Sequence, residues 1–408
     1  MGHRIRLRRD PLAYIEELSR GSTAKVMRLP WGGWCVRDTE LAQKLLRDPE
    51  YHRGGSVFFG ELLPARGAQA ELGRAVRSLL RAGVPRYRAA LPEAVAALPT
   101  ASRWPDTGTR LVYRCLADVL LHPGTPGGGR ELMRQAAHEG VAVRSPHVWQ
   151  RARAELVRAR LVTAVTEEAH RRRRQPADEP QDMLDAVLTV CPEAEMPDRT
   201  VADLHLMMFR AIMAPVSASL AWSVLLACLH HTRATPWPWP VEHVVREALR
   251  HRPAPWMLGR TLPRAVDLGG TVLPAGELLS VCPYLLHHDE RHWDSPDAFQ
   301  PERWADSSGH GPYIPFGTGP FGCAGAAVAH TLLTESLTAL TDHACLAVTD
   351  GDTRAVMSEG NVPRPFILHR TPDHPPDTTR EGGDQPWPPR CDASSPTSQP
   401  DAGTGTDD

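Results

Sequence analysis

The sequence concentrates its chemistry in one glycine-rich stretch around a cysteine, Pro315-Phe-Gly-Thr-Gly-Pro-Phe-Gly-Cys-Ala-Gly325. Three glycines within the six residues before Cys323 allow a tight loop with positive φ angles and a close approach of the backbone to a flat ligand. A helical pattern follows, so backbone N–H groups and the helix dipole favour the thiolate form of Cys323. Such a thiolate suits a soft metal, and as an axial ligand it pushes electron density onto haem iron. A glycine-rich turn around an inert, buried cysteine is the alternative.

Two charged motifs precede this loop. The first is Glu247-Ala-Leu-Arg250, and about fifty residues later the second reads Phe299-Gln-Pro-Glu-Arg-Trp304. A single Glu–Arg pair at i,i+3 is common on helix surfaces and contributes roughly a few tenths of a kcal/mol, so the first motif alone indicates little. The order of the motifs and the loop over residues 241–348 is specific, and it resembles the cytochrome P450 family. The family's loop pattern FGxGxxxCxG is matched by Phe316, Gly317, Gly319, Cys323 and Gly325.

This resemblance implies a mainly α fold with small β-sheets, the cytochrome P450 fold. In it, haem b lies between a long distal helix and the proximal loop and helix that carry Cys323, the iron ligand. Arg77 and Arg260 correspond to partners of the haem propionates. The remaining residues implied to contact the cofactor are Pro315, Phe316, Gly317, Phe321 and Gly325.

The resemblance also implies a buried ion-pair triad of Glu247, Arg250 and Arg303. Such a network is costly to bury and needs every partner, so we interpret it as architecture rather than catalytic machinery. Two positions that the family usually fills with basic residues differ here: Gly73 replaces a histidine, and Phe321 stands two residues before the ligand. We therefore expect weaker electrostatic anchoring of haem, and better haem retention in Phe321→Arg.

A long apolar segment is the candidate for the other side of the site. Residues 211–229 are nearly free of charge over about the length of a membrane span. The segment contains Pro215 and three serines, lies in the middle of the chain and has no second span as partner. We predict a helix buried inside a large protein, not a membrane anchor.

This helix aligns with the family's distal helix, whose AGx(D/E)T pattern supplies an acid–alcohol pair for proton delivery. The same places here read Ala211-Ile-Met-Ala-Pro215, so Ala214 replaces the acid and Pro215 the alcohol, and no Asp or Glu occurs between residues 203 and 242. Proline lacks an N–H, so we expect the helix to kink or open locally. Ser219 is expected on the same face, either holding a catalytic water or capping a helix carbonyl.

Short sheet and helix signals surround these motifs. Residues 25–29 and 34–37 flank a Pro-Trp-Gly-Gly turn and predict a hairpin, after which Asp38 is a suitable N-cap for a helix over residues 39–47.

Three more segments have clear local patterns. Residues 257–262 and 266–284 have strand patterns, the second interrupted by turns at Gly269-Gly270 and Pro274-Ala275-Gly276. A helix is predicted from 324 to about 343. The run of four arginines from 171 to 174 indicates a solvated last helical turn, which complements the helix dipole, rather than a docking patch.

Length and composition set the remaining bounds. The 408 residues are 41% hydrophobic, which is ample for a large core. We expect one haem domain over residues 1–370 and a disordered tail over 371–408, which holds eight prolines and many acids. The net charge of −2 gives no footprint for nucleic acid. The eight cysteines form no CxxC pair and no signal peptide is evident, which favours the cytoplasm.

The function implied by the resemblance is a bacterial-type monooxygenase. It would oxidise a small, largely hydrophobic organic molecule in bacterial secondary metabolism, with electrons from a ferredoxin and a ferredoxin reductase. Because the acid–alcohol pair is missing, two alternatives stay open. One is an enzyme of the same fold that uses peroxide, a nitrogen oxide or redox-neutral chemistry, and the other is a non-catalytic haem-binding relative.

Overall fold

The computed structural model describes the chain from Gly2 to Asp373, except for residues 52–57, 61, 126–127, 140–147, 177, 192–195, 233–234, 307–309, 320–321 and 358–360. Phe321 and nearly all of the expected tail therefore lie outside the described residues. The domain boundary expected at residue 370 stays a prediction, although the last strand continues slightly beyond it. Thr371 and Pro372 still pair with Cys345 and Ala344 in a sheet, where backbone pairing requires no apolar pattern.

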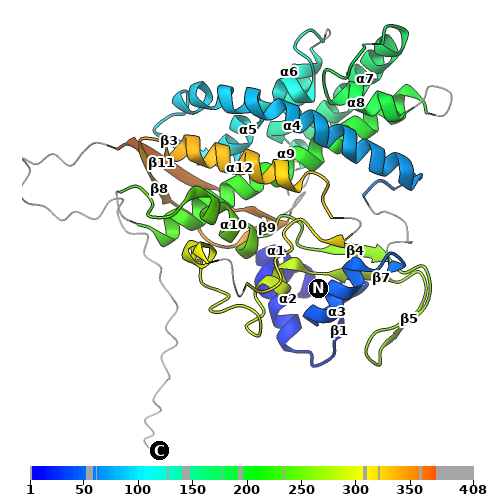
Figure 1. Cartoon of the computed structure of the whole chain (residues 1–408), viewed down its shortest axis with the longest axis vertical. Helices are drawn as coiled ribbons and strands as arrows, with labels where there is room; N and C mark the ends of the chain where they lie inside the picture. The colour runs from blue at the N-terminus through cyan, green and yellow to red at the C-terminus, as the bar shows by residue number, and fades with distance from the viewer. Residues whose placement is uncertain are drawn as a thin grey trace, which may run out of the picture.

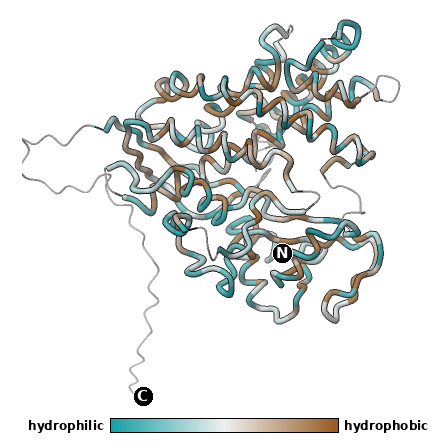
Figure 2. Tube along the Cα trace, viewed as in Figure 1, coloured by the Kyte–Doolittle hydropathy of each residue, from teal (hydrophilic) through white to brown (hydrophobic). Residues whose placement is uncertain are grey.

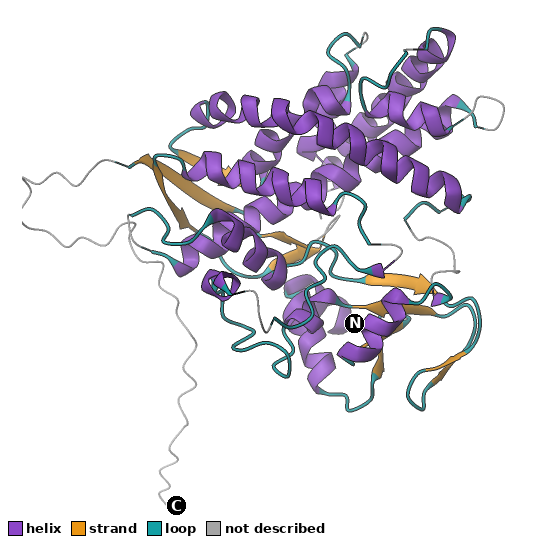
Figure 3. Cartoon of the chain, viewed as in Figure 1, coloured by secondary structure: helices purple, strands orange, loops and turns teal. Residues whose placement is uncertain are grey.

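Helices form most of the described structure, as the sequence predicts (Figure 3). In chain order the α-helices are α1 Gly2–Arg9, α2 Pro11–Arg20, α3 Thr39–Arg47, α4 Arg66–Ala96, α5 Asp106–Leu120, α6 Gly129–Glu139, α7 Val148–Arg174, α8 Met183–Val190, α9 Asp198–His230, α10 Val241–His251, α11 Pro283–His287 and α12 Ala326–Thr341. A 3₁₀-helix covers Pro301–Ala305. Polar and apolar residues alternate along these helices, as expected for helices that are buried on one side (Figure 2).

The sheets are small. The largest has the order β1-β2-β7-β4, from strands Val26–Arg28, Trp34–Val36, Leu278–Val281 and Leu258–Thr261, with β2 parallel to β7 in the register Trp34↔Leu279. A second has the order β3-β11-β8, from Ala101–Trp104, Phe366–Pro372 and Ala344–Thr349. Two antiparallel pairs complete the set, namely β5 Val266–Asp267 with β6 Val272–Leu273, and β9 Ala355–Met357 with β10 Asn361–Pro363. Figure 1 shows the β4–β7 region on the opposite side of the molecule from α4 to α8.

Several local predictions are confirmed. Strands β1 and β2 pair as an antiparallel hairpin, and Gly32 and Gly33 take positive φ angles in its turn. The side chain of Asp38 accepts a hydrogen bond from the Leu41 N–H at 2.8 Å, so it caps α3 as expected.

The stretch predicted over residues 266–284 divides into β5, β6 and β7 at the two predicted turns, where Gly269, Gly270 and Gly276 take positive φ angles. The prediction is wrong at its end, because α11 begins at Pro283. Proline is favourable at the first position of a helix because the missing N–H has no helical partner there. Tyr284 is therefore helical.

The prediction of a solvated arginine run at the end of α7 is wrong for Arg172. This side chain is buried and donates hydrogen bonds to Glu168, Asp182 and Asp185 at 2.6–2.8 Å. Asp182 also caps α8. The run thus contributes a buried ion network that ties α7 to α8, because the acids of the following helix reach back to it.

The apolar helix predicted over residues 211–229 is part of α9, which packs against α5, α7, α10 and α12. It is long and apolar enough to cross a membrane, but 83% of its most apolar window is buried inside the protein. The helix runs through Pro215 without interruption, so the expected opening is not observed. A proline removes one helical hydrogen bond, and the packing around α9 preserves the rest.

Candidate functional site

The Cys323 loop is fixed by its own backbone. The Gly317 N–H donates to the Ile314 carbonyl at 3.0 Å, and the Cys323 N–H donates back to the Phe316 carbonyl at 2.9 Å. The Ala326 N–H, at the start of α12, donates to the Cys323 carbonyl at 3.2 Å. Cys323 therefore lies directly before the first turn of α12, as predicted.

Two of the three glycines before the cysteine are required by the backbone. Gly317 and Gly319 have φ angles of 71° and 77°. A Cβ at Gly319 would lie 2.2 Å from the Leu46 carbonyl oxygen, so the loop packs directly on the end of α3. Gly322 takes no positive φ, which corrects the expectation that all three glycines serve this purpose.

The thiol of Cys323 is the reactive group of the loop. Its side chain is exposed, whereas Cys35, Cys115, Cys191, Cys228, Cys282 and Cys345 are all buried. Desolvation raises the pKa of Cys323, and a hydrogen bond from the Gly325 N–H opposes this by lowering it. The expectation that backbone N–H groups favour the thiolate is thus correct in direction for Gly325, but the effect of desolvation on the pKa is larger.

Arg77 and Arg260 flank this loop from two elements. A Cβ at Gly73, on α4, would lie 3.6 Å from the Cβ of Ala324, and Arg77 follows one helical turn later on the same face. On β4, Leu258 lies 3.6 Å from the Cβ position of Gly317, and Arg260 points to the same side two residues later. Burial lowers the pKa of Arg260. The structure therefore places Gly73 and Leu258 beside the loop, and the contacts of Arg77 and Arg260 with the cofactor stay a prediction.

The predicted triad is assembled around Glu247. Glu247 and Arg250 are both 0% exposed. Two nitrogens of Arg250 donate to the Glu247 carboxylate at 2.8 and 3.0 Å, and Arg303 donates at 3.1 Å. Arg250 also donates to the carbonyls of His287, Pro296 and Ala298 at 2.8–3.0 Å. The buried charges are therefore fully hydrogen-bonded, as such a network requires.

Two partners of this network were not predicted. The Trp304 indole N–H donates to Glu247 at 3.0 Å, as does the Gln300 backbone N–H. Trp304 is the last residue of the second charged motif, so its indole N–H could have been predicted as a donor to Glu247.

His287 links the network to the cysteine loop and was also missed. Its Nδ1–H donates to the Arg250 carbonyl, and its Nε2 accepts from the Ile314 N–H, both at 2.9 Å. Burial lowers the pKa of His287 to about 3, so the ring is neutral and both bonds persist at neutral pH. Only tertiary structure identifies these partners.

The other side of the site comes from α9. Met207, Met208, Ala211, Ala214 and Pro215 are partly exposed and recur at helical spacing, so they form one accessible face of this otherwise buried helix. Between Ala211 and Pro215 this face presents neither an acid nor an alcohol, whereas the exposed Arg210 and the partly exposed Asp203 lie towards the start of the helix.

Ser219, expected on the face of Pro215, is only 4% exposed, and its carbonyl accepts the Ser223 hydroxyl at 2.8 Å. Its neighbour Ser217 has a buried hydroxyl with no partner among the described residues.

The donor set of the site fits haem. Within the described ranges, no cluster of three or more His, Cys, Asp or Glu side chains is placed to hold a metal ion by itself. A single exposed cysteine fits a metal that brings its other ligands with it, as iron in a porphyrin does. The sequence-based expectation is that Arg77 and Arg260 would supply positive charge for the acidic groups of that ring.

Comparison with known proteins agrees with this geometry. Residues 241–353 match the family model described as Cytochrome P450. Over 88 residues the chain is 40% identical to Cytochrome P450 3A5 of Homo sapiens. The aligned segment covers 21% of this chain and 18% of that protein. Over 103 residues it is 37% identical to Cyclooctatin synthase of Streptomyces melanosporofaciens, and this aligned segment covers 24% of the chain and 22% of that protein. The match thus spans only about a fifth of these relatives.

The whole fold has a counterpart among solved structures. A zebrafish cytochrome P450 structure with progesterone superposes with a TM-score of 0.70, covering 89% of this chain and 99% of that one at 20% sequence identity. At this identity the likeness concerns the fold.

Proposed function

Because the chain has the cytochrome P450 fold and its residues 241–353 belong to the cytochrome P450 family, we propose that it is a haem-thiolate monooxygenase of a small, largely hydrophobic organic molecule. The observation that carries the proposal is Cys323, an exposed thiol directly before α12 on a loop that the buried Glu247 network fixes through His287.

In this proposal Cys323 is the axial ligand of haem b, which supplies one-electron and dioxygen chemistry when bound. Arg77 and Arg260 bind the propionates. The porphyrin ring would contact further residues of the cysteine loop, namely Pro315, Phe316, Gly317, Phe321 and Gly325. Glu247, Arg250 and Arg303 keep the loop in register and do not touch the reacting atoms.

The accessible face of α9 covers the reacting side. Its methionines, Ala211 and Ala214 favour apolar contacts with a substrate, and Pro215 leaves the Ala211 carbonyl without its usual helical donor. A water or a substrate hydroxyl can donate to that carbonyl, so we propose that protons come from ordered water or from the substrate. Ser219 is a candidate to hold such a water.

Partners follow from the same proposal. We propose a ferredoxin and a ferredoxin reductase as electron donors and the cytoplasm as the location. A role in bacterial secondary metabolism is supported by the similarity to Cyclooctatin synthase.

The direct test is turnover under ¹⁸O₂. Holoprotein with ferredoxin, reductase and NADPH is offered a set of terpenoid, polyketide and aromatic candidates that perturb its Soret band. The proposal predicts a product that carries one ¹⁸O atom. Consumption of NADPH with no labelled product for every tight-binding candidate would contradict it.

Ala214 and Pro215 favour a second candidate, an enzyme of the same fold that works from peroxide or a nitrogen oxide, because neither residue can donate a proton. This candidate predicts turnover with hydrogen peroxide, or with a nitrogen oxide, in the absence of ferredoxin. A strict requirement for dioxygen and reduced ferredoxin would exclude it. A non-catalytic haem-binding role is excluded by either kind of turnover.

A further inference from the structure

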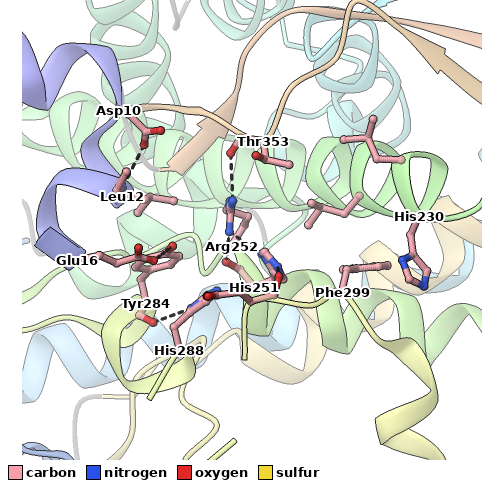
Figure 4. A pocket seen from close by; sticks show the side chains of 14 residues that line it. Asp10, Leu12, Glu16, His230, His251, Arg252, Tyr284, His288, Phe299 and Thr353 are labelled. Carbon is pink, nitrogen blue, oxygen red and sulfur yellow. Dashed lines mark hydrogen bonds between the residues drawn. The ribbon is translucent and has the colours of Figure 1, made fainter. Parts of the chain in front are cut away.

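Two arginines of the molecule differ in their access to a ligand. Figure 4 shows a cavity with Arg252 in its wall, together with Asp10 and Glu16. Arg252 is only 7% exposed. Burial lowers its pKa, and the nearby charges of Glu16 and Asp10 raise it. Arg252 is therefore a compensated, structural cation, whereas Arg210 of α9 is exposed.

Arg210 is the only charged side chain in a long apolar stretch of α9. No other Asp, Glu, Lys or Arg occurs between Asp203 and His230. Most residues of this stretch are buried, including the nearby Phe209 and Ile212. A guanidinium is costly to bury among apolar side chains, so the charge is placed on the side of the helix that stays accessible.

Helical spacing joins Arg210 to the accessible face of α9. Met207 lies three residues before it and Ala214 four residues after it, and residues at these spacings are neighbours on a helix surface. Both neighbours are partly exposed. At about 1.5 Å per residue, Arg210 and Ala214 are roughly 6 Å apart along the helix axis. The guanidinium thus adjoins the part of α9 that covers the reacting side in the proposed function.

The acids of α9 do not lie next to Arg210 along the helix. Asp203 precedes it by roughly 10 Å along the axis and accepts a hydrogen bond from Arg199 at 3.2 Å. No Asp or Glu follows until Glu242. An arginine has five N–H donors in a planar fork, so an exposed guanidinium keeps donors for a ligand beside any contact within the protein.

We propose that, in the monooxygenase of the proposed function, on which this inference rests, Arg210 selects substrates that carry one carboxylate. The planar fork of arginine matches the two oxygens of a carboxylate, so the pair fixes the orientation of the substrate. The apolar body of the substrate lies against Met207, Ala211 and Ala214. The single charge on this stretch favours one negative charge on the ligand over two. The substrate class is thus a hydrophobic monocarboxylic acid.

Matched pairs of an acid and its amide test this selectivity. Suitable skeletons of increasing size are those of 1-adamantanecarboxylate, dodecanoate and abietate, each compared with its own carboxamide. The amide keeps the shape but lacks the charge. At pH 7.5 the acids are ionised, because carboxyl groups have ordinary pKa values of about 4. In titrations of the ferric holoprotein followed at the Soret band, at least one acid should bind tenfold or more tightly than its amide.

Variants on α9 assign the selectivity to one side chain. Arg210→Gln should remove the preference for the acid, while binding of the amide stays within threefold and haem content is unchanged, which shows that the pocket is intact. Arg210→Lys keeps the charge and should keep part of the preference. Arg199→Gln removes the same charge from another exposed position of the helix and should change the preference by less than twofold.

The comparison of acid and amide in the parent protein needs no variant. The inference is overturned if no acid shifts the Soret band, if every amide binds as tightly as its acid, if Arg210→Gln keeps the preference, or if Arg210→Gln loses haem as a propionate partner would. Labelled product from neutral molecules without any preference for acids would contradict this inference alone. A preference for acids without labelled product from any candidate would contradict only the proposed function.

Discussion

On the loop side of Cys323, the charged groups of the Glu247 network are buried and hydrogen-bonded, whereas on the α9 side the partly exposed Ala211, Ala214 and Pro215 carry no proton donor. The loop side agrees with the family pattern in motif order and in contacts. The α9 side departs from it at the two places that usually carry the proton donors. Holding the cofactor and choosing the reaction are therefore separable properties, and variants on the two sides should fail in different ways.

The largest effect is expected from Glu247→Ala, which leaves Arg250 buried without its acid. Breaking a buried pair in this way costs about 3–5 kcal/mol, so we expect a large loss of stability together with loss of haem. Denaturant unfolding and the ratio of haem to protein measure both. Glu242→Ala is the matched control, since it breaks an exposed pair with Arg246 on the same helix and should cost at most about 1 kcal/mol. Equal effects of the two variants would contradict the assigned role.

Arg260→Ala should lower haem affinity without unfolding the protein. A hydrogen bond to a charged group contributes about 1.5–3 kcal/mol, so we expect haem dissociation to accelerate by roughly tenfold or more. Haem transfer to apomyoglobin measures the rate. Arg264→Ala removes an exposed arginine from the turn that follows β4, and it should change the rate of haem dissociation by less than twofold. An unchanged rate for Arg260→Ala would remove it from the haem contacts.

On the α9 side, Ala214→Glu combined with Pro215→Thr restores an acid and an alcohol. General acid catalysis typically contributes a factor of about 10²–10⁴, so a rise of roughly tenfold or more in product formed per NADPH is expected for the proposed monooxygenase. The Soret spectrum should not change. If coupling stays the same while peroxide-driven turnover is high in the parent protein, the second candidate function is favoured instead.

His287 gives a smaller, pH-dependent effect. Its folded pKa of about 3 lies below the ordinary 6.5, so the unfolded chain takes up the proton first. The contribution of His287 is complete above pH 6.5 and is lost as the pH falls from 6.5 towards 3, by about 1.4 kcal/mol per pH unit. Between pH 7.5 and 5 the free energy of unfolding should therefore change less with pH in His287→Gln than in the parent protein. Parallel curves would contradict the neutral, bridging ring.

Sequence reasoning reached the parts of the site that depend on local spacing. The glycines before Cys323, the cap at Asp38 and the two charged motifs each have a physical signature within a few residues. The burial of α9 was also predictable from its apolar length, whereas its continuity through Pro215 was not. Its exposure pattern was not, because which face stays accessible depends on the helices that pack around it.

The missed features depend on partners distant in the sequence. His287 joins the Arg250 carbonyl to the Ile314 N–H, and neither partner is marked by a side-chain type. Arg172 was placed in solvent because its neighbours are arginines, yet Asp182 and Asp185 of the next helix bury it. Long-range packing decided each case.

The central claim is that Cys323 is the thiolate ligand of haem, and the reduced carbon monoxide difference spectrum tests it most directly. Parent protein should show the thiolate-haem Soret band, and Cys323→Ser should lose it while folding normally. Cys345→Ser, at a buried cysteine that interacts with Asp373, should keep the band. Absence of the band in the parent protein, or its persistence in Cys323→Ser, would contradict the account.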